Sequence, residues 1–212
     1  MSGQRPLKYL IVYGPTQEPF DPVRYLTNRS TGTMGRLLVQ AARRSGHRVT
    51  AIQCPDQART ARDLLRQLRS LIGRHDVFIM AAAVCDVRPA RVSGSKIKKE
   101  ALQTVRFVKN PDILRELRKR KTKNQAFVGF ALESHALDRN AHKKLISKGL
   151  DLIVGQKVSQ KIDPFGPVSM DVLLLTPDGE RKAYARITKT ALARILVSCG
   201  EFLARQKASK KA

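Results

Sequence analysis

The sequence predicts an α/β fold with a Rossmann-like, mostly parallel sheet and helices on both faces. Short apolar runs that read as buried strands alternate with stretches of helical periodicity, and this β-α-β-α-β order favours a parallel sheet with right-handed crossovers. The first apolar run, at residues 7–13, leads into a loop rich in Gly, Ser and Thr that precedes a helix. With 212 residues, 42% of them apolar, the chain can bury one substantial core.

Each strand and helix is assigned from its own pattern. Apolar residues from Met34 to Ala42 recur at helical spacing, and Gly46 ends that helix. Apolar runs predict further strands at residues 48–52, 77–83, 126–131 and 150–154. Helical spacing predicts further helices at residues 64–73, 111–121, 137–145 and 192–203.

Two segments depart from this alternation. Residues 88–110 are rich in Pro, Ser, Gly and Lys, which indicates a flap or hairpin excursion from the sheet. Near the C-terminus, strands at 171–175 and 181–187 flank a Pro-Asp-Gly hairpin signal, and a last helix follows. We therefore expect one domain over residues 1–204 and a basic, disordered tail at 205–212.

Composition limits the classes of partner and compartment. The net charge of +24 favours polyanions, but the basic residues are spread along the chain and aromatic residues make up only 5%. Two interpretations of this charge stay open: a generally solvated basic surface, and weak, non-specific binding of nucleic acid. No apolar stretch approaches the ~20 residues of a membrane span, and the N-terminus lacks the apolar centre of a signal peptide, so we expect a cytoplasmic protein with no membrane partner. Three distant cysteines, in no metal-ligand spacing, argue against disulfides and zinc.

Ligands of open α/β sheets bind at the carboxyl ends of the strands. Four predicted loops lie there, after Tyr13, Ala83, Ala131 and Val154. The turn after the first strand lacks the G-x-G-x-x-G of a dinucleotide site, the second strand ends without an acidic residue, and no Walker loop is present. A helix start rich in Gly, Ser and Thr offers backbone N–H groups and the positive end of a dipole, which predicts an anion-binding enzyme.

Several motifs then point to one family. The segments GPTQEPFDPVRYLTNRSTGTMG, AAAVCDVRPA, KIKK, VKNPDIL and VGFALE occur in this order between about residues 8 and 202. Together they resemble phosphopantothenate–cysteine ligase, the phosphopantothenoylcysteine synthetase of coenzyme A biosynthesis, in its bacterial, CTP-dependent type. In most bacteria that domain is fused behind a flavin-dependent decarboxylase. The resemblance therefore implies a stand-alone synthetase here and a separate decarboxylase.

The resemblance also implies a reaction, its cofactors and an assembly. Such a ligase joins 4′-phosphopantothenate to L-cysteine with CTP and Mg²⁺, through an acyl-cytidylate, and releases pyrophosphate and then CMP. It forms a homodimer in which the excursion contributes to the contact and to the neighbouring site. The alternative function is a relative of altered or lost activity that binds nucleotides or nucleic acid through its basic surface.

Two residues would carry catalysis by this resemblance. Asn28 would contact the acyl-cytidylate and donate to a developing oxyanion without adding a charge. Lys96, the first lysine of KIKK, would close over the nucleotide and intermediate from a flexible flap. The alternatives are a turn or capping role for Asn28 and a solvated surface for the lysine run.

The remaining expected site residues would bind the nucleotide, its phosphates or the metal. They are Gly14, Ser30, Thr31, Gly32, Gly35, Ala82, Ala83, Asp86, Pro111, Asp112, Ile113, Leu114, Phe130, Lys144 and Lys148. Residues 30–35 would form a phosphate cradle, for which an ordinary helix cap is the alternative. Asp86 would hold Mg²⁺ or bond the pantothenate hydroxyl or amide, or it is a turn residue. Lys144 and Lys148, an i,i+4 pair, would contact the nucleotide or form a general helix surface.

A few positions depart from the pattern of the resembling family. Thr31, Thr33 and Val87 stand where serine, lysine and an aromatic residue are usual, and Gln156-Lys157 replaces Asn-Asp. These departures bear on details of nucleotide and substrate contact and leave the resemblance itself intact.

Overall fold

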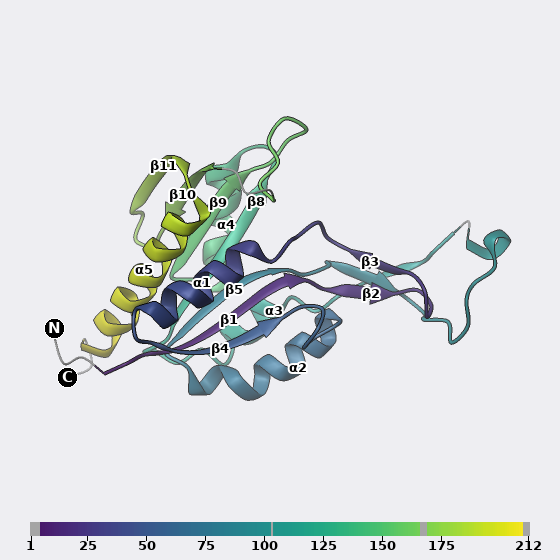
Figure 1. The fold of residues 1–212 in the computed structure, drawn as a ribbon, viewed down its shortest axis with the longest axis horizontal. Coiled ribbons are helices and arrows are strands. Elements are labelled where there is room, and N and C mark those ends of the chain that lie inside the picture. Colours follow the sequence, from purple (N-terminus) through teal and green to yellow (C-terminus); the bar gives the residue numbers. More distant parts are fainter. Residues whose placement is uncertain (1–4, 103, 166–168, 210–212) are drawn as a thin grey trace.

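A seven-stranded sheet forms the centre of the fold (Figure 1). The structure is a computed structural model that describes residues 5–102, 104–165 and 169–209. The strands of this sheet are β1 (Lys8–Pro15), β4 (Arg48–Gln53), β5 (Val77–Ala83), β8 (Ala126–Glu133), β9 (Leu152–Lys157), β10 (Met170–Leu175) and β11 (Arg181–Ile187). They lie in the order β11-β10-β9-β8-β5-β1-β4. β10 pairs antiparallel with both β9 and β11, and the other neighbouring strands pair parallel. The predicted fold class is confirmed.

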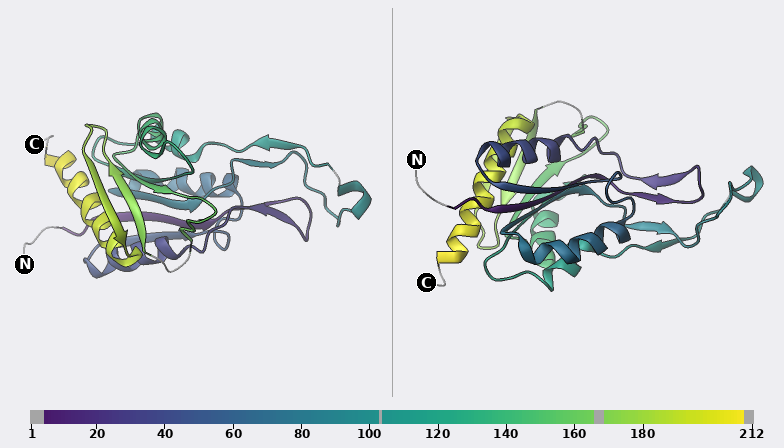
Figure 2. Two further views of the ribbon diagram at one scale, coloured as in Figure 1. Left: turned by 90° about the horizontal axis from the view of Figure 1, so that it is seen from above. Right: turned by 60° about the horizontal axis from the view of Figure 1, so that its bottom comes forward.

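Helices cover both faces of the sheet. They are α1 (Thr33–Arg44), α2 (Ala61–Leu71), α3 (Ile113–Arg118), α4 (Leu137–Lys148) and α5 (Lys189–Ser209), with 3₁₀ turns η1 (Ile72–Arg74) and η2 (Lys99–Leu102). Because successive strand side chains point to opposite faces, Leu10 and Val12 of β1 pack into the core under α2, α3 and α4, whereas Tyr9 and Ile11 pack into the core under α1 and α5. Figure 2 shows α1 and α2 on opposite sides of the strands. None of the helices in the described part of the chain is both long and apolar enough to span a membrane.

Two hairpins project together from one end of the sheet and form an arm (Figures 1 and 2). The first pairs β2 (Gln17–Pro19) with β3 (Tyr25–Thr27), and the second pairs β6 (Val87–Pro89) with β7 (Phe107–Lys109). Phe20 meets Phe107 edge-on across the two hairpins, with ring centroids 6.1 Å apart. The expected excursion at residues 88–110 thus leaves the sheet. The first hairpin is additional, because it lies inside the segment expected to be a single loop.

Two helices end differently from the sequence prediction. α5 continues to Ser209 in place of a disordered tail from residue 205, because Ala204 is buried and Lys207 forms an ion pair with Asp151 (2.5 Å). Residues 210–212 of the expected tail lie outside the described residues. α3 is shorter than the expected helix at 111–121. It begins after Asp112, whose side chain caps it by accepting from the Arg115 N–H, and it ends at Arg118.

Candidate active site

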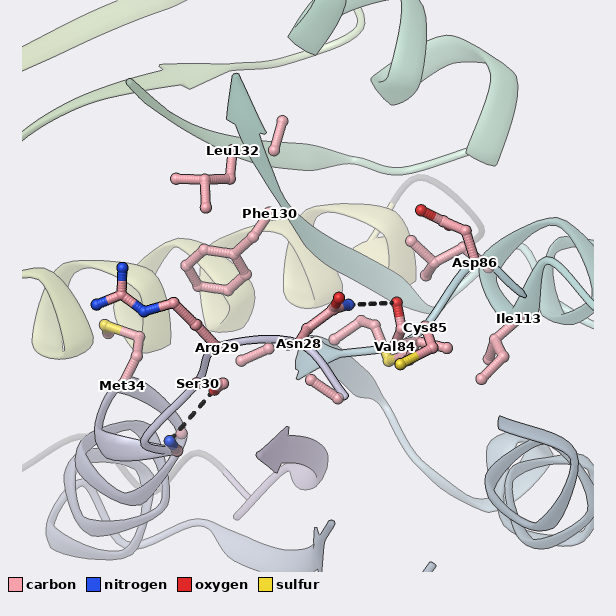
Figure 3. Close-up of a pocket in the computed structure, with 18 of the residues that line it drawn as sticks. Asn28, Arg29, Ser30, Met34, Val84, Cys85, Asp86, Ile113, Phe130 and Leu132 are labelled. Carbon is pink, nitrogen blue, oxygen red and sulfur yellow. Dashed lines mark hydrogen bonds between the residues drawn. The ribbon is translucent and has the colours of Figure 1, made fainter. Parts of the chain in front are cut away.

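A cavity of about 760 Å³ opens at the carboxyl ends of β5 and β8, beside the start of α1 (Figure 3). The chain reverses its direction across the sheet between β1 and β5, and ligands of such folds bind at that point. Every expected site residue except Gly14 and Lys96 lines the cavity: Asn28, Ser30, Thr31, Gly32, Gly35, Ala82, Ala83, Asp86, Pro111, Asp112, Ile113, Leu114, Phe130, Lys144 and Lys148. Residues far apart in the sequence therefore meet at one place.

Asn28 lies in the middle of the cavity residues that Figure 3 labels. Its Nδ2 atom donates a hydrogen bond to the carbonyl oxygen of Val84 (3.0 Å), in the loop after β5. The Thr27 hydroxyl donates to the carbonyl oxygen of Thr16 (2.7 Å), which fixes the chain just before Asn28. A side-chain amide carries two N–H donors, so the held Asn28 can still donate to a ligand.

The turn before α1 presents small polar groups to the cavity. Gly32 has a left-handed φ of 68°, and its N–H donates to the Ser30 hydroxyl (3.3 Å). The hydroxyl oxygens of Thr31 and Thr33 lie 2.9 Å apart, and Arg36 donates to Thr33 Oγ1 (3.0 Å). Hydroxyls, backbone N–H groups and the start of a helix together suit an anion.

Gly14 and Gly35 are the first and last residues of the motif GPTQEPFDPVRYLTNRSTGTMG, and both have packing reasons for their identity. Gly35 lines the cavity, but a Cβ there would lie 1.9 Å from the Cβ of Tyr13, so the close approach of α1 to β1 requires glycine. Gly14 lies behind the cradle and does not line the cavity. Its φ is +84°, and a Cβ would lie 2.1 Å from the carbonyl oxygen of Cys54. The crowding at the end of β4 therefore gives Gly14 a packing reason for its identity, and its expected contact with a ligand stays a prediction.

The start of α3 and the last turns of α4 build a second, cationic part of the cavity. The Asp112 carboxylate accepts from the Arg115 N–H (3.1 Å) and forms an ion pair with Lys148. Burial, with the nearby charge of Lys148 as a second cause, lowers the pKa of the Lys144 ammonium. No carboxylate within the described ranges lies close enough to Lys144 to form an ion pair with it. A polyanion bound here would relieve the repulsion between the two lysines.

Asp86 places an exposed carboxylate just past the end of β5. Its carbonyl oxygen accepts from the Asn110 N–H (2.8 Å), and Asn110 Nδ2 donates to the carbonyl of Cys85 (2.9 Å), so the loop is tied to the base of the second hairpin. Among residues 5–102, 104–165 and 169–209, no three His, Cys, Asp or Glu side chains gather as a metal cluster. Mg²⁺ takes one or two carboxylates and fills its shell with water and phosphate oxygens, so the single Asp86 carboxylate is compatible with it.

The comparison with known proteins follows this geometry. Residues 5–200 match the family described as the DNA/pantothenate metabolism flavoprotein C-terminal domain. The chain belongs to this family. The resemblance drawn from the motifs is thereby confirmed.

The relatives of this chain include bifunctional proteins that are about twice as long. The coenzyme A biosynthesis bifunctional protein CoaBC of Escherichia coli (strain K12) is 36% identical over 190 residues, which cover 82% of this chain and 47% of that protein. The CoaBC protein of Vibrio vulnificus (strain YJ016) is 38% identical over 199 residues, 87% of this chain and 49% of that protein. The chain therefore spans about half the length of these curated relatives.

A solved structure supports the same fold. The crystal structure of the C-terminal domain of a CoaBC protein aligns with a TM-score of 0.76 at 28% identity and covers 94% of this chain and 96% of that chain. The sheet, the covering helices and their order are thus those of the C-terminal half of the CoaBC proteins.

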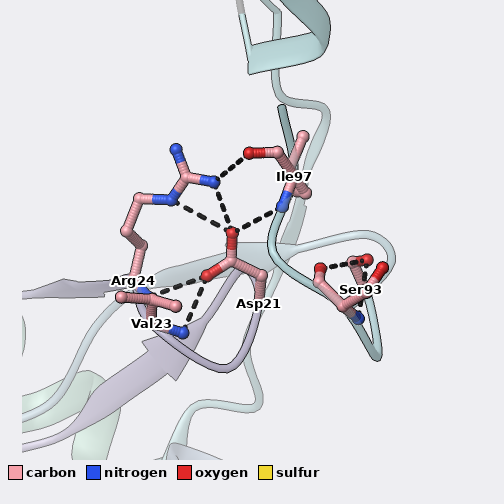
Figure 4. A network of polar contacts seen from close by, with 6 residues as sticks. Asp21, Val23, Arg24, Ser93 and Ile97 are labelled. Atoms are coloured by element: carbon pink, nitrogen blue, oxygen red, sulfur yellow. Dashed lines mark hydrogen bonds and ion pairs between the residues drawn. The ribbon is translucent and has the colours of Figure 1, made fainter. Parts of the chain in front are cut away.

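Lys96 lies on the arm, outside the cavity, and its side chain is exposed. The next residue, Ile97, is held at both backbone groups (Figure 4): its N–H donates to Asp21 Oδ2 (3.1 Å), and its carbonyl accepts from Arg24 (2.7 Å). Arg24 also pairs with the buried Asp21 carboxylate (2.5 Å), which lowers the pKa of Asp21. Lys96 is therefore anchored beside the first hairpin and away from the cavity of its own chain.

The cavity also holds polar and aromatic residues that are not among the expected site residues, including Arg29, Asn110, Phe165 and Lys189. Arg29 and Asn110 lie inside motifs that carry the family resemblance, so the sequence holds a signal for both. Phe165 follows β9, whose carboxyl end faces the site. Lys189 begins α5 and carries no local signal of ligand binding, because the tertiary fold alone brings it there.

Proposed function

We propose that this domain is a CTP-dependent phosphopantothenate–cysteine ligase of coenzyme A biosynthesis. The observation that carries the proposal is the convergence of Asn28, Asp86, Phe130 and the lysine pair of α4 on one cavity. Membership of the family and the likeness to CoaBC proteins support the same function. We place the reaction in the cytoplasm, with a flavin-dependent decarboxylase acting on the product.

The reaction has two chemical steps. The carboxylate of 4′-phosphopantothenate attacks the α-phosphate of CTP, forms an acyl-cytidylate and expels pyrophosphate. The amine of L-cysteine then attacks the acyl carbon, the acyl–phosphate bond breaks toward CMP, and the amine loses a proton as the amide forms. Catalysis consists chiefly of positioning the reactants and neutralising the charge that develops on them.

The nucleotide would occupy the part of the cavity formed by α3 and α4. Lys144 and Lys148 would pair with phosphate oxygens, and Lys148 would exchange its present partner, Asp112, for them. The apolar side chains of Ile113 and Leu114, with Phe130, would flank the nucleoside. Asp86 would hold Mg²⁺, which, when bound, neutralises phosphate charge during displacement at the α-phosphate.

Asn28 would act at the point where the two substrates meet. Its bond to the Val84 carbonyl fixes the direction of the amide before the substrates bind. A preorganised N–H donor stabilises an oxyanion without the reorganisation that solvent would need. The hydroxyls and backbone of residues 30–33 would hold phosphate oxygens beside it.

Lys96 would act on the cavity of a second copy of the chain. The Asp21–Arg24 clamp on Ile97 holds this lysine on the projecting arm, so a partner's cavity suits its position better than its own. Val23 and Tyr25 leave apolar surface exposed on the same arm, which supports a homodimer that buries the arm.

One assay tests the function directly. Purified protein is incubated with CTP, 4′-phosphopantothenate, L-cysteine and Mg²⁺, and pyrophosphate and CMP are measured while each component is omitted in turn. We expect pyrophosphate release to need CTP and phosphopantothenate, and CMP release to need cysteine as well. Polynucleotide binding that weakens with salt, without turnover, would instead support a non-catalytic relative.

A further inference from the structure

One peptide group of the cavity wall, between Val84 and Cys85, is held from both sides. Its carbonyl oxygen, on Val84, accepts the hydrogen bond from Asn28 Nδ2 (3.0 Å) that Figure 3 shows. Its N–H, on Cys85, donates to Thr16 Oγ1 (3.0 Å). Because a peptide group is planar and its C=O and N–H point in opposite directions, this group connects the Thr16 hydroxyl to the Asn28 amide.

Thr16 lies behind the cavity wall and does not line the cavity itself. It stands between β1 and β2 and is fully buried. Because bulk water does not reach this depth, the Thr16 hydroxyl oxygen is a fixed acceptor for the peptide N–H.

The backbone of Thr16 holds the two chain segments that carry this contact. Its N–H donates to the carbonyl oxygen of Ala83 (3.2 Å), just before the shared peptide group. Its carbonyl oxygen accepts from the Thr27 hydroxyl (2.7 Å), just before Asn28. The contacts therefore form a closed ring, from Thr16 through the shared peptide group to Asn28, and through Thr27 back to Thr16.

The other contacts of Cys85 fix the position of the segment. Its Sγ atom lies 3.8 Å from the carbonyl oxygens of Thr16 and Leu26, and its own carbonyl oxygen accepts from Asn110 Nδ2 (2.9 Å). A peptide group can still rotate between fixed Cα atoms, and a bond to its own N–H opposes that rotation. The Thr16 hydroxyl supplies this bond.

We propose that Thr16 is a positioning residue, whose hydroxyl holds the Val84–Cys85 peptide group and through it sets the direction of the Asn28 amide. Hydrogen bonds in a chain polarise one another, so the bond at the peptide N–H also makes the carbonyl a stronger acceptor for Asn28. The direction of the amide is a property of the protein without substrates. Its effect on turnover rests on the proposed ligase function.

Two matched substitutions isolate the hydroxyl. Thr16→Val keeps nearly the same side-chain shape but removes the oxygen, whereas Thr16→Ser keeps the oxygen. In isotope-labelled protein without substrates, NMR relaxation measures the picosecond-to-nanosecond motion of Asn28 Nδ2. We expect this amide to be rigid in wild type and in Thr16→Ser and mobile in Thr16→Val. An equally rigid amide in folded Thr16→Val would overturn the proposal.

Steady-state kinetics measures the consequence for turnover. We expect Thr16→Val to lower kcat by about 10- to 100-fold, the cost of a misaligned catalytic group, with an unchanged KM for CTP. Thr16→Ser should restore kcat. When Asn28→Asp is already present, Thr16→Val should have little further effect, because both substitutions disturb one contact. Effects that multiply in the double variant would show that Thr16 acts on the fold in general and would overturn its positioning role.

Controls separate positioning from stability and from the overall function. Thr50→Val removes a hydroxyl on β4 that contacts His75 Nε2 (2.8 Å) outside the cavity, and thermal unfolding is measured for every variant. We expect Thr50→Val to keep kcat, and an equal fall in kcat there would overturn a specific role of Thr16. If Thr16→Val does not fold, Thr16→Ala, which also lacks the oxygen, replaces it. A wild type with a rigid Asn28 amide but no pyrophosphate release would overturn the ligase function and leave the positioning contact standing.

Discussion

Lys148 of α4 and Asp112, the residue that caps α3, form an ion pair in the wall of the cavity. The same Asp112 carboxylate accepts the Arg115 N–H, so it links the start of one helix to the end of another. The pair keeps the lysine pointed at the proposed nucleotide site. The negative charge of Asp112 also offsets part of the repulsion between the ammonium groups of Lys144 and Lys148.

Removal of the Lys148 charge should weaken nucleotide binding. We expect Lys148→Met to raise the KM for CTP by about ten- to a hundredfold, as the loss of one hydrogen bond to a charged group predicts. The KM for cysteine should stay unchanged. Lys143→Met, an exposed neighbour on the same helix, is the control. Steady-state pyrophosphate release measures both, and equal effects of the two substitutions would contradict a specific role.

Asn28→Asp should fold and lose turnover. The substitution keeps the side-chain size but replaces an N–H donor by a negative charge that faces the Val84 carbonyl oxygen. We expect kcat to fall by about 10²- to 10³-fold, the usual cost of one oxyanion donor. Circular dichroism verifies the fold, and near-normal turnover would remove Asn28 from the mechanism.

Mixing two inactive variants tests whether Lys96 acts between subunits. If Lys96 completes the partner's cavity, a dimer of one Asn28→Asp chain and one Lys96→Gln chain contains one intact site. After subunit exchange at equal concentrations, we expect about a quarter of the wild-type activity from this symmetric assembly. Activity that stays absent in the mixture, although exchange is verified, would place Lys96 at the cavity of its own chain.

The clamp of Asp21 on the arm should be insensitive to pH near neutrality. The hydrogen bond from Arg24 lowers the pKa of the Asp21 carboxyl, so its stabilising effect is present above the ordinary aspartate range and is lost only as pH falls through the lowered pKa. We expect Ile97 amide exchange to rise in Asp21→Ala at every pH from about 5 to 8. Hydrogen-exchange mass spectrometry measures it, and wild-type exchange in the variant would show that other contacts hold the arm.

Gly35→Ala should destabilise the fold even though it adds one methyl group. The added Cβ would lie 1.9 Å from the Cβ of Tyr13, so α1 must move away from β1. We expect a loss of about 1–3 kcal/mol in the free energy of unfolding, as for other overpacked cores. Gly73→Ala is the control, since no atom lies within 4 Å of its added Cβ and its φ is not positive. Urea denaturation compares the two variants.

Local patterns were sufficient for most elements but not for their ends. The apolar runs mark six of the seven strands of the sheet, because their side chains are buried or half-buried there, and the helical stripes mark the helices that cover it. The seventh strand, β11, is mostly exposed and follows from the hairpin signal before it. The β2–β3 hairpin escapes this method, because its strands have three residues each and carry no clear alternation. The end of α5 escapes it as well, since Lys207 is held by Asp151, 56 residues away.

The sequence by itself determined the family, the α/β class and the position of Asn28 in a loop before a helix, because motif and periodicity are local properties of the chain. Only the tertiary structure decided which of the expected residues share a cavity. It placed Lys96 on an arm and Gly14 against Cys54, and it brought Arg29 to Asp163 across 134 positions. Such pairings depend on the order of the strands in the sheet, and no short stretch of residues encodes that order alone.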